Sequence, residues 1–411
     1  MTRQVVSPLA APVLLLSAGS EVITLSLVEE LARAGAPIAL AAFGRTSLLA
    51  RSPRLHAYRE ITWPDAPERA VRALSDWLGP IAERARAPLV AFATDDAVLR
   101  LLLEQRRELE PYVLVPRAHA LAMSGLDKAE LFEFLRAHGA AELSPPSCVL
   151  DSLADLPGAI ERLGPELVLK PALKPYRVEL ALDRAGRKLL ASWEYETSQA
   201  FQRALAASWD FSPRWLAQAR MHAPPEGEAV VYVVRVPGGE TRLVSAVARW
   251  KHPPVGGTGC VVETLPNPEL EAAARRLAEL IDLRGLAELE YLIDDSGSFK
   301  LLDVNARPWL QVALAGVAGL PVAALTWQAL AGGALELPPD PTGRSRSWVM
   351  PERLLLSLVA GGPGSRFAAA RRALGYVLRA DYVPVHQSAL GGVRRAWYGR
   401  MLRALLRRLN G

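Results

Sequence analysis

The segment that determines how this sequence is interpreted begins at Gly285-Leu-Ala-Glu-Leu-Glu-Tyr-Leu-Ile293. After the short turn Asp294-Asp295-Ser296-Gly297, it continues as Phe299-Lys-Leu-Leu-Asp-Val-Asn-Ala-Arg-Pro-Trp309. Two mainly apolar runs on either side of a turn rich in Asp, Ser and Gly predict a hairpin of two antiparallel strands. The carboxylate, amide and guanidinium groups within the second run are unusual for a strand of this kind.

The hairpin predicts a cluster of oxygen ligands. Because side chains alternate across a strand, Asp303, Asn305 and Arg307 are expected on one face of the second strand, and Glu288 and Glu290 on one face of the first. Pairing of the strands then brings Glu290, Asp303 and Asn305 together. Such hard oxygen donors, without histidine or cysteine, suit Mg²⁺ that holds nucleotide phosphates, and Arg307 adds a fixed cation. The alternative is a solvated hairpin face.

The run Leu302-Asp-Val-Asn-Ala-Arg-Pro-Trp309 resembles the metal-binding signature of the ATP-grasp superfamily, which is a carboxylate, an apolar residue, asparagine, any residue and arginine. The resemblance implies ATP and Mg²⁺ (or Mn²⁺) as cofactors, with Glu290, Asp303 and Asn305 as metal ligands. The family more often has glutamate where this chain has Asp303, which is shorter by one methylene group.

The resemblance extends to residues that bind the nucleotide in this family. Lys128, at the start of a predicted helix, and Lys170, at the end of an apolar strand, correspond to the lysines that reach the phosphates. Gln218 and Met221 correspond to the hinge that contacts adenine, and Glu228 to the carboxylate that binds the ribose hydroxyls.

A basic segment is expected beside the γ-phosphate and the substrate carboxylate. Arg249-Trp-Lys251-His252, followed by the glycine turn 256–259, resembles it, and we predict that Arg249, Lys251 and Arg307 stabilise an acyl phosphate. One feature departs from the family, because residues 171–187 contain the single glycine Gly186 where many relatives have a glycine-rich loop. Lys188 is a candidate replacement for its phosphate contacts.

The N-terminal part has a different pattern. Apolar strands predicted at 13–16, 38–43 and 89–93 are separated by amphipathic helical stretches, which indicates a parallel sheet covered on both faces. Open α/β sheets bind ligands at the carboxyl ends of their strands. Asp95 and Asp96 follow such a strand, and the resemblance places them near the acceptor-substrate pocket.

These patterns predict an α/β and α+β protein of several domains. Residues 1–120 are expected to form a parallel-sheet, Rossmann-like pre-ATP-grasp domain, and residues 121–335 a two-lobed ATP-grasp domain. Its nucleotide lobe covers 121–225 and its metal and substrate lobe covers 226–335. Residues 336–411 are expected to form a helical, basic extension.

Composition limits the classes of function. The chain has 411 residues, a formal net charge of +5 and only two cysteines, Cys148 and Cys260, far apart. This spacing predicts neither a zinc site nor a disulfide framework and fits a cytoplasmic protein. Without a basic run interleaved with aromatics, nucleic acid is not expected as a partner. The apolar run 8–16 is needed as the first strand, so we do not interpret it as a signal peptide, and no stretch is long enough to span a membrane.

The C-terminal segment 393–411 has six arginines, no acidic residue and an apolar stripe at helical spacing. It is expected to pack on the rest of the protein. Contact with an anionic membrane surface is the alternative.

The predicted activity is that of an ATP-dependent carboxylate–amine ligase acting on small-molecule carboxylate and amine substrates. Alternatives are a nucleotide-binding pseudoenzyme or regulatory protein, and a biotin-dependent carboxylase subunit. The absence of a biotinyl-lysine domain disfavours the last.

Overall fold

The computed structural model describes residues 11–384, except for 45, 63–66, 225–226, 237, 253–256, 295, 333–334, 336, 342 and 361–365. Between 175 and 211, only residues 193–194, 203, 205–207 and 209 are described. Gly186, Lys188 and the segment 393–411 therefore lie outside the described residues.

The N-terminal region forms a five-stranded parallel sheet in the order β3-β2-β1-β4-β5. The strands are β1 Val13–Ser17, β2 Ile38–Phe43, β3 Leu55–Ile61, β4 Leu89–Ala93 and β5 Val113–Leu114, and the helices are α1 Glu21–Arg33, α2 Pro67–Ala85, α3 Asp96–Glu104 and α4 Arg106–Leu109. Alternate residues of β1 enter separate cores on the two faces of the sheet, so the predicted parallel sheet buried on both faces is confirmed. The sequence did not predict β3, a partly exposed edge strand that carries several polar side chains.

A second, smaller sheet is antiparallel and has the order β7-β10-β8-β9. Its strands are β7 Ser147–Leu150, β8 Leu167–Pro171, β9 Trp193–Glu194 and β10 Trp215–Ala219. Around it lie α5 Lys128–Ala137, α6 Leu156–Leu163 and the short 3₁₀ turns η1 Ala141–Leu143 and η2 Leu153–Asp155. The strand predicted to end at Lys170 is confirmed as β8.

The third sheet is antiparallel, with the order β15-β14-β11-β12-β13-β16 and β6 paired to β14. Its strands are β6 Arg117–Ala118, β11 Glu228–Arg235, β12 Thr241–His252, β13 Thr258–Thr264, β14 Leu283–Ile293, β15 Phe299–Asn305 and β16 Ser347–Val349. Helix α8 (Pro268–Leu280) covers one face, and α9 (Val312–Ala318) and α10 (Val322–Leu330) cover the other. Strand β12 continues through Arg249 and Lys251, so this basic segment is strand and not loop.

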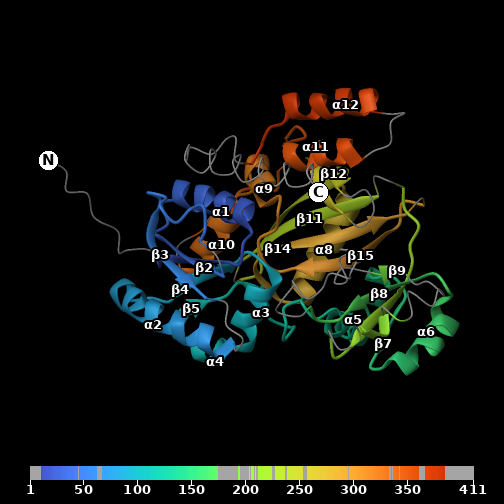
Figure 1. The fold of residues 1–411 in the computed structure, drawn as a ribbon, viewed down its shortest axis with the longest axis horizontal. Helices are drawn as coiled ribbons and strands as arrows, with labels where there is room; N and C mark the ends of the chain where they lie inside the picture. The colour runs from blue at the N-terminus through green and yellow to red at the C-terminus, as the bar shows by residue number, and fades with distance from the viewer. Residues whose placement is uncertain are drawn as a thin grey trace.

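One core joins the parallel sheet to the third sheet, as α1 beside α9 and α10 indicates in Figure 1. It contains Leu15 of β1 together with Tyr232 of β11 and Leu314 of α9. Across this junction, the Trp327 indole donates a hydrogen bond to the carbonyl of Ala11 at 2.7 Å. The orientation of the N-terminal sheet relative to the hairpin of β14 and β15 is therefore set by apolar packing.

The C-terminal region contributes to the third sheet through β16, which pairs with β13. Helices α11 (Pro351–Ala360) and α12 (Arg366–Arg379) follow, at the top of Figure 1. In the described part of the chain, no single helix is long and apolar enough to cross a bilayer. Only α9 and α10 taken together reach that length and apolar character, and this pair is bent by 91°.

Candidate functional site

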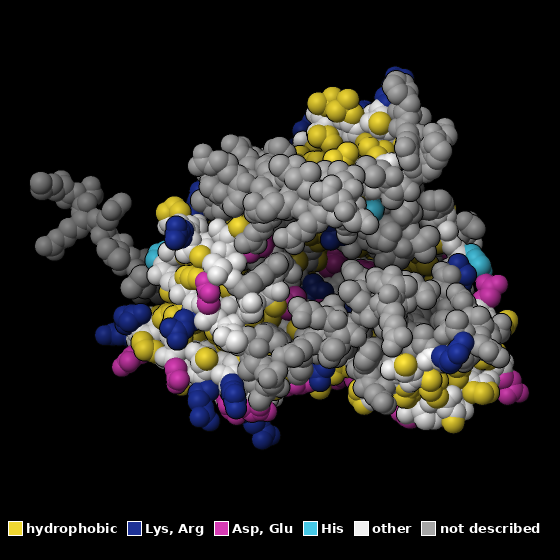
Figure 2. Space-filling view, viewed as in Figure 1, with side chains coloured by type: hydrophobic (Ala, Val, Ile, Leu, Met, Phe, Trp, Pro, Cys, Tyr) yellow, Lys and Arg dark blue, Asp and Glu magenta, His cyan; other side chains and the backbone are white. Residues whose placement is uncertain are grey.

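Charged side chains gather in a hollow near the middle of the face seen in Figure 2. A cavity between α3, α5 and β15 is lined by residues of these elements and of two connecting segments: Asp96, Arg100, Gly125, Leu126, Lys128, Leu173, Lys174, Asp303, Val304 and Asn305. The hairpin predicted from the sequence therefore opens onto a site shared by several regions of the chain.

The hairpin pairs as the sequence predicted. Glu290 lies opposite Asp303 and Glu288 opposite Asn305 in the β14–β15 register. A register shift after Glu290 places Tyr291 opposite Leu301, and both of these side chains enter the apolar core. Simple alternation would have put Leu301 on the same face as Asp303. The bulge separates them, because a bulge changes which face the following side chains occupy.

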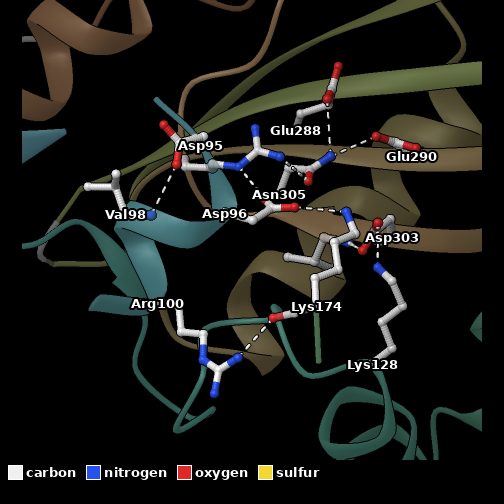
Figure 3. Close-up of polar contacts among 12 residues, drawn as sticks. Asp95, Asp96, Val98, Arg100, Lys128, Lys174, Glu288, Glu290, Asp303 and Asn305 are labelled. Atoms are coloured by element: carbon white, nitrogen blue, oxygen red, sulfur yellow. Dashed lines mark hydrogen bonds and ion pairs between the residues drawn. The ribbon is translucent and has the colours of Figure 1, made fainter. Parts of the chain in front are cut away.

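Asn305 links the acidic side chains, as Figure 3 shows. Its amide nitrogen donates to Glu290 at 2.6 Å and to Glu288 at 3.2 Å. Burial, reinforced by the neighbouring carboxylates, raises the pKa of Glu288 well above its usual value and also raises the pKa of Glu290. The ionised forms of these two carboxylates are therefore costly here, and a bound cation would favour them.

Lys128 lies directly against the acidic cluster. It is the first residue of α5, whose N-cap Asp127 accepts hydrogen bonds from two backbone N–H groups, and its Nζ lies 2.5 Å from Oδ2 of Asp303. Burial alone would raise the pKa of Asp303, but Lys128 and Lys174 outweigh it and hold that pKa below its usual value. The preceding Gly125 has φ +90°, and a Cβ there would meet Val304 at 3.0 Å, so glycine permits this close approach.

Lys170 approaches the same strand from β8. Its Nζ donates to the carbonyl of Leu302 at 3.4 Å. Burial, together with the charge of Lys128, lowers the pKa of Lys170 to about 8, although Asp303 and Glu290 act in the opposite direction. Both lysines that the sequence assigned to the phosphates therefore reach β15.

Asp96, at the N-terminus of α3, connects the parallel sheet to this site (Figure 3). Its carboxylate accepts hydrogen bonds from Nε of Arg307 at 2.5 Å and from Nζ of Lys174 at 2.8 Å. Arg100 donates to the carbonyl of Lys174 at 2.9 Å, so α3 holds Lys174 through both its side chain and its backbone. Lys174 and Arg100 were not predicted as site residues from the sequence, because nothing in their local pattern distinguishes them from surface cations.

The other predicted residues occupy β10, β11 and β12. Gln218 is buried in β10 and donates to the hydroxyl of Ser147 at 3.0 Å, and Met221 follows shortly after that strand. Glu228, at the start of β11, forms an ion pair with Lys251. Arg249 pairs with Glu263 of β13 at 3.0 Å. Neither of these two ion pairs includes Glu288, Glu290 or Asp303.

The donor set fits a magnesium–nucleotide complex better than an isolated metal ion. Within the described ranges, no group of three or more His, Cys, Asp and Glu side chains is arranged to hold a metal. Glu290, Asp303 and Asn305 supply two carboxylates and one amide oxygen. Mg²⁺ is commonly bound by one or two carboxylates together with substrate phosphates. Lys128 and Lys170 stand beside these oxygens, where they suit phosphate groups.

Comparison with known proteins finds D-alanine–D-alanine ligases among the sequence relatives. No protein-family model matches the chain. The D-alanine–D-alanine ligase of Ectopseudomonas mendocina is 25% identical over 193 residues, which are 46% of this chain and 57% of that ligase. The chain thus aligns with a little more than half the length of this curated relative.

Two solved structures resemble about four fifths of the chain. The L-amino acid ligase of Bacillus licheniformis matches with a TM-score of 0.59 at 14% identity, covering 82% of this chain and 79% of the ligase. The biotin carboxylase of Campylobacter jejuni matches with a TM-score of 0.59 at 15% identity, covering 79% of this chain and 71% of the carboxylase. Together with the sheets and the hairpin described above, these similarities show that the chain shares the fold of these enzymes, and the chain resembles the ATP-grasp superfamily.

Proposed function

We propose that the chain is an ATP- and Mg²⁺-dependent ligase that joins a carboxylate to an amine. A carboxylate oxygen attacks the γ-phosphorus of ATP, the bond to ADP breaks, and an acyl phosphate forms. The amine nitrogen then attacks the acyl carbon, the C–O bond to phosphate breaks, and the nitrogen loses a proton. The products are an amide or peptide, ADP and phosphate.

The observation that carries this proposal is the convergence on β15 of oxygen donors and lysines from separate regions. Asp303 faces Glu290 and Lys128, while Lys170 reaches the same strand from β8. Carboxylates alone would repel a nucleotide, and lysines alone would not hold its metal. The combination suits a metal-bound polyphosphate.

Each group has a role in this proposal. When bound, Mg²⁺ neutralises phosphate charge and orients the γ-phosphoryl group. Lys128 and Lys170 bind the phosphates as point charges in a largely water-excluded site. Arg307, Arg249 and Lys251 stabilise the acyl phosphate. Gln218 and Met221 bind adenine, and Glu228 binds the ribose. Mg²⁺ or Mn²⁺ would be held by Glu290, Asp303 and Asn305.

The relatives support a class of substrates. The names of the D-alanine–D-alanine and L-amino acid ligases support small-molecule carboxylate and amine substrates, with an amino acid as the favoured acceptor. We also propose the division into 1–120, 121–335 and 336–411 as domains, and a cytoplasmic location, where ATP and free amino acids are available.

Screening of amino acids for substrate-dependent ADP release, with hydroxylamine present to trap the acyl phosphate, tests the proposal. A hydroxamate that requires ATP, Mg²⁺ and a particular carboxylate supports it. The Asp303→Asn variant is the matched control and should give no hydroxamate. ATP binding without carboxylate-dependent turnover across a broad screen would overturn the ligase assignment and favour a nucleotide-binding regulatory protein.

A further inference from the structure

Glu288 is a third carboxylate on the acidic face, and the proposed ligase mechanism does not use it. It lies on β14, opposite Asn305 on one side and opposite Tyr232 of β11 on the other. Only 6% of its surface is exposed. A carboxylate buried to this degree is costly unless it has a specific partner.

The partner is the amide of Asn305. Its nitrogen has two hydrogens and contacts one oxygen of Glu290 and one of Glu288, while its oxygen accepts from Nη2 of Arg307 at 3.2 Å. A guanidinium only donates, so the end of the amide that faces Arg307 must be its oxygen. These neighbours therefore fix which end of the amide faces which way. The orientation matters because an amide oxygen can ligate a hard cation and an amide nitrogen cannot.

Glu288 and Glu290 are not equivalent in this arrangement. Glu290 is itself a proposed metal ligand, so its oxygens are also needed by the cation. Glu288 lies beside the stacked rings of Tyr232 and Trp309, whose centroids are 4.8 Å apart and which are almost completely buried. These buried rings shield the Glu288 side chain from solvent.

We propose that Glu288 is a positioning residue, which holds the Asn305 amide so that its oxygen is available to the metal ion. The inference rests on the proposed metal site of the ligase. It assigns to Glu288 a hydrogen-bonding role and not a charge that contacts the cation. Partners of this kind behind a metal ligand typically change metal affinity by about 10- to 100-fold when they are removed.

Two substitutions separate hydrogen bonding from charge. Glu288→Gln keeps an oxygen acceptor for Asn305, whereas Glu288→Leu keeps similar bulk without one. Mn²⁺ binding to the full-length protein, followed by electron paramagnetic resonance in the presence of ADP, is the measurement. We expect Glu288→Gln to bind Mn²⁺ within about threefold of the unsubstituted protein and Glu288→Leu to bind about 10- to 100-fold more weakly. ADP binding without metal should not change in either variant.

The Asp303→Asn variant shows which proposal fails. If Asp303→Asn retains Mn²⁺ binding, the proposed metal site is wrong. If it loses binding while Glu288→Leu does not, only the role of Glu288 is wrong. Equal weakening by Glu288→Gln and Glu288→Leu would also overturn the inference, because the charge would then be what matters. Thermal unfolding checks that the variants are folded, and Glu288→Ala replaces the leucine variant if that one does not fold.

Discussion

Nε of Arg307 lies 2.5 Å from Oδ1 of Asp96, although the two residues are 211 positions apart in the chain. Arg307 follows β15 directly, and Asp96 begins α3 of the N-terminal sheet. Burial alone would raise the pKa of Asp96, but Arg307 and Lys174 outweigh it and hold the pKa well below its usual range. The parallel-sheet region is thus tied electrostatically to the candidate phosphate site.

Removal of the Asp96 charge should destabilise the protein. Asp96→Asn leaves the largely buried Arg307 and the partly exposed Lys174 without their carboxylate. Loss of one partner of a buried pair costs about 3 kcal/mol. Urea unfolding monitored by tryptophan fluorescence measures this. The control is Glu142→Gln, because Glu142 pairs with Arg276 where both side chains are more than half exposed. The control should change stability by less than about 1 kcal/mol. Equal effects of the two substitutions would contradict the prediction.

The proposed metal ligands are expected to be essential for turnover. Asp303→Asn and Asn305→Ala should abolish Mg²⁺-dependent ADP release, because the metal's hold on the β,γ-phosphates weakens where charge develops in the transition state. Circular dichroism should show that the fold is retained. If Asp303→Asn keeps more than about a tenth of the activity, which corresponds to a barrier change below ~1.4 kcal/mol, the ligand assignment is wrong.

Substitution of the two lysines proposed to bind phosphate should raise the KM for ATP more than the KM for the carboxylate substrate. Lys128→Ala and Lys170→Ala are each expected to remove a charge-assisted contact worth ~1.5–3 kcal/mol, which raises the KM for ATP by roughly 10- to 150-fold. Steady-state kinetics with each substrate varied in turn provides the comparison. Lys300→Ala is the matched control, because Lys300 also lies on β15 but donates to the carbonyl of Glu142. Equal increases for both substrates would indicate damage to the fold.

Glu30 should make stability depend on pH. It is buried in α1 and accepts hydrogen bonds from the backbone N–H groups of Ala323 and Ala324 at the start of α10, and burial raises its pKa from 4.5 to about 7. A raised pKa means that the folded state holds the proton more tightly than the unfolded state. The contribution to stability is therefore complete below about pH 4.5 and is lost as the pH rises through about 7.

Glu30→Gln tests this dependence, because glutamine accepts the same hydrogen bonds without titrating. The unsubstituted protein should lose up to about 3 kcal/mol of unfolding free energy between pH 5 and pH 8 from this group, and the variant should lack that loss. Urea denaturation at both pH values measures the difference. The same pH dependence in both proteins would show that Glu30 is not the group responsible.

The sequence by itself determined the local elements, namely the buried strands and the hairpin, because residues that are neighbours in the chain form each of them. The apolar runs of β1, β2, β4 and β8 predicted their strands, because a buried strand consists mainly of apolar residues. The hairpin was predictable in the same way, since a turn between two strands fixes which residues lie opposite each other. Glu290, Asp303 and Asn305 were therefore brought together in advance by alternation and pairing alone.

Only the tertiary structure decided the contacts that cross between regions. The pairing of Asp96 with Arg307 and Lys174 depends on how the N-terminal sheet is seated against the third sheet, which apolar packing of α1 on α9 and α10 fixes. The bulge that turns Leu301 into the core while Asp303 faces the site breaks the simple alternation. In both cases, the geometry results from packing between segments that are far apart in the chain. The packing energy depends on all of these segments together, so it cannot be predicted from any one of them.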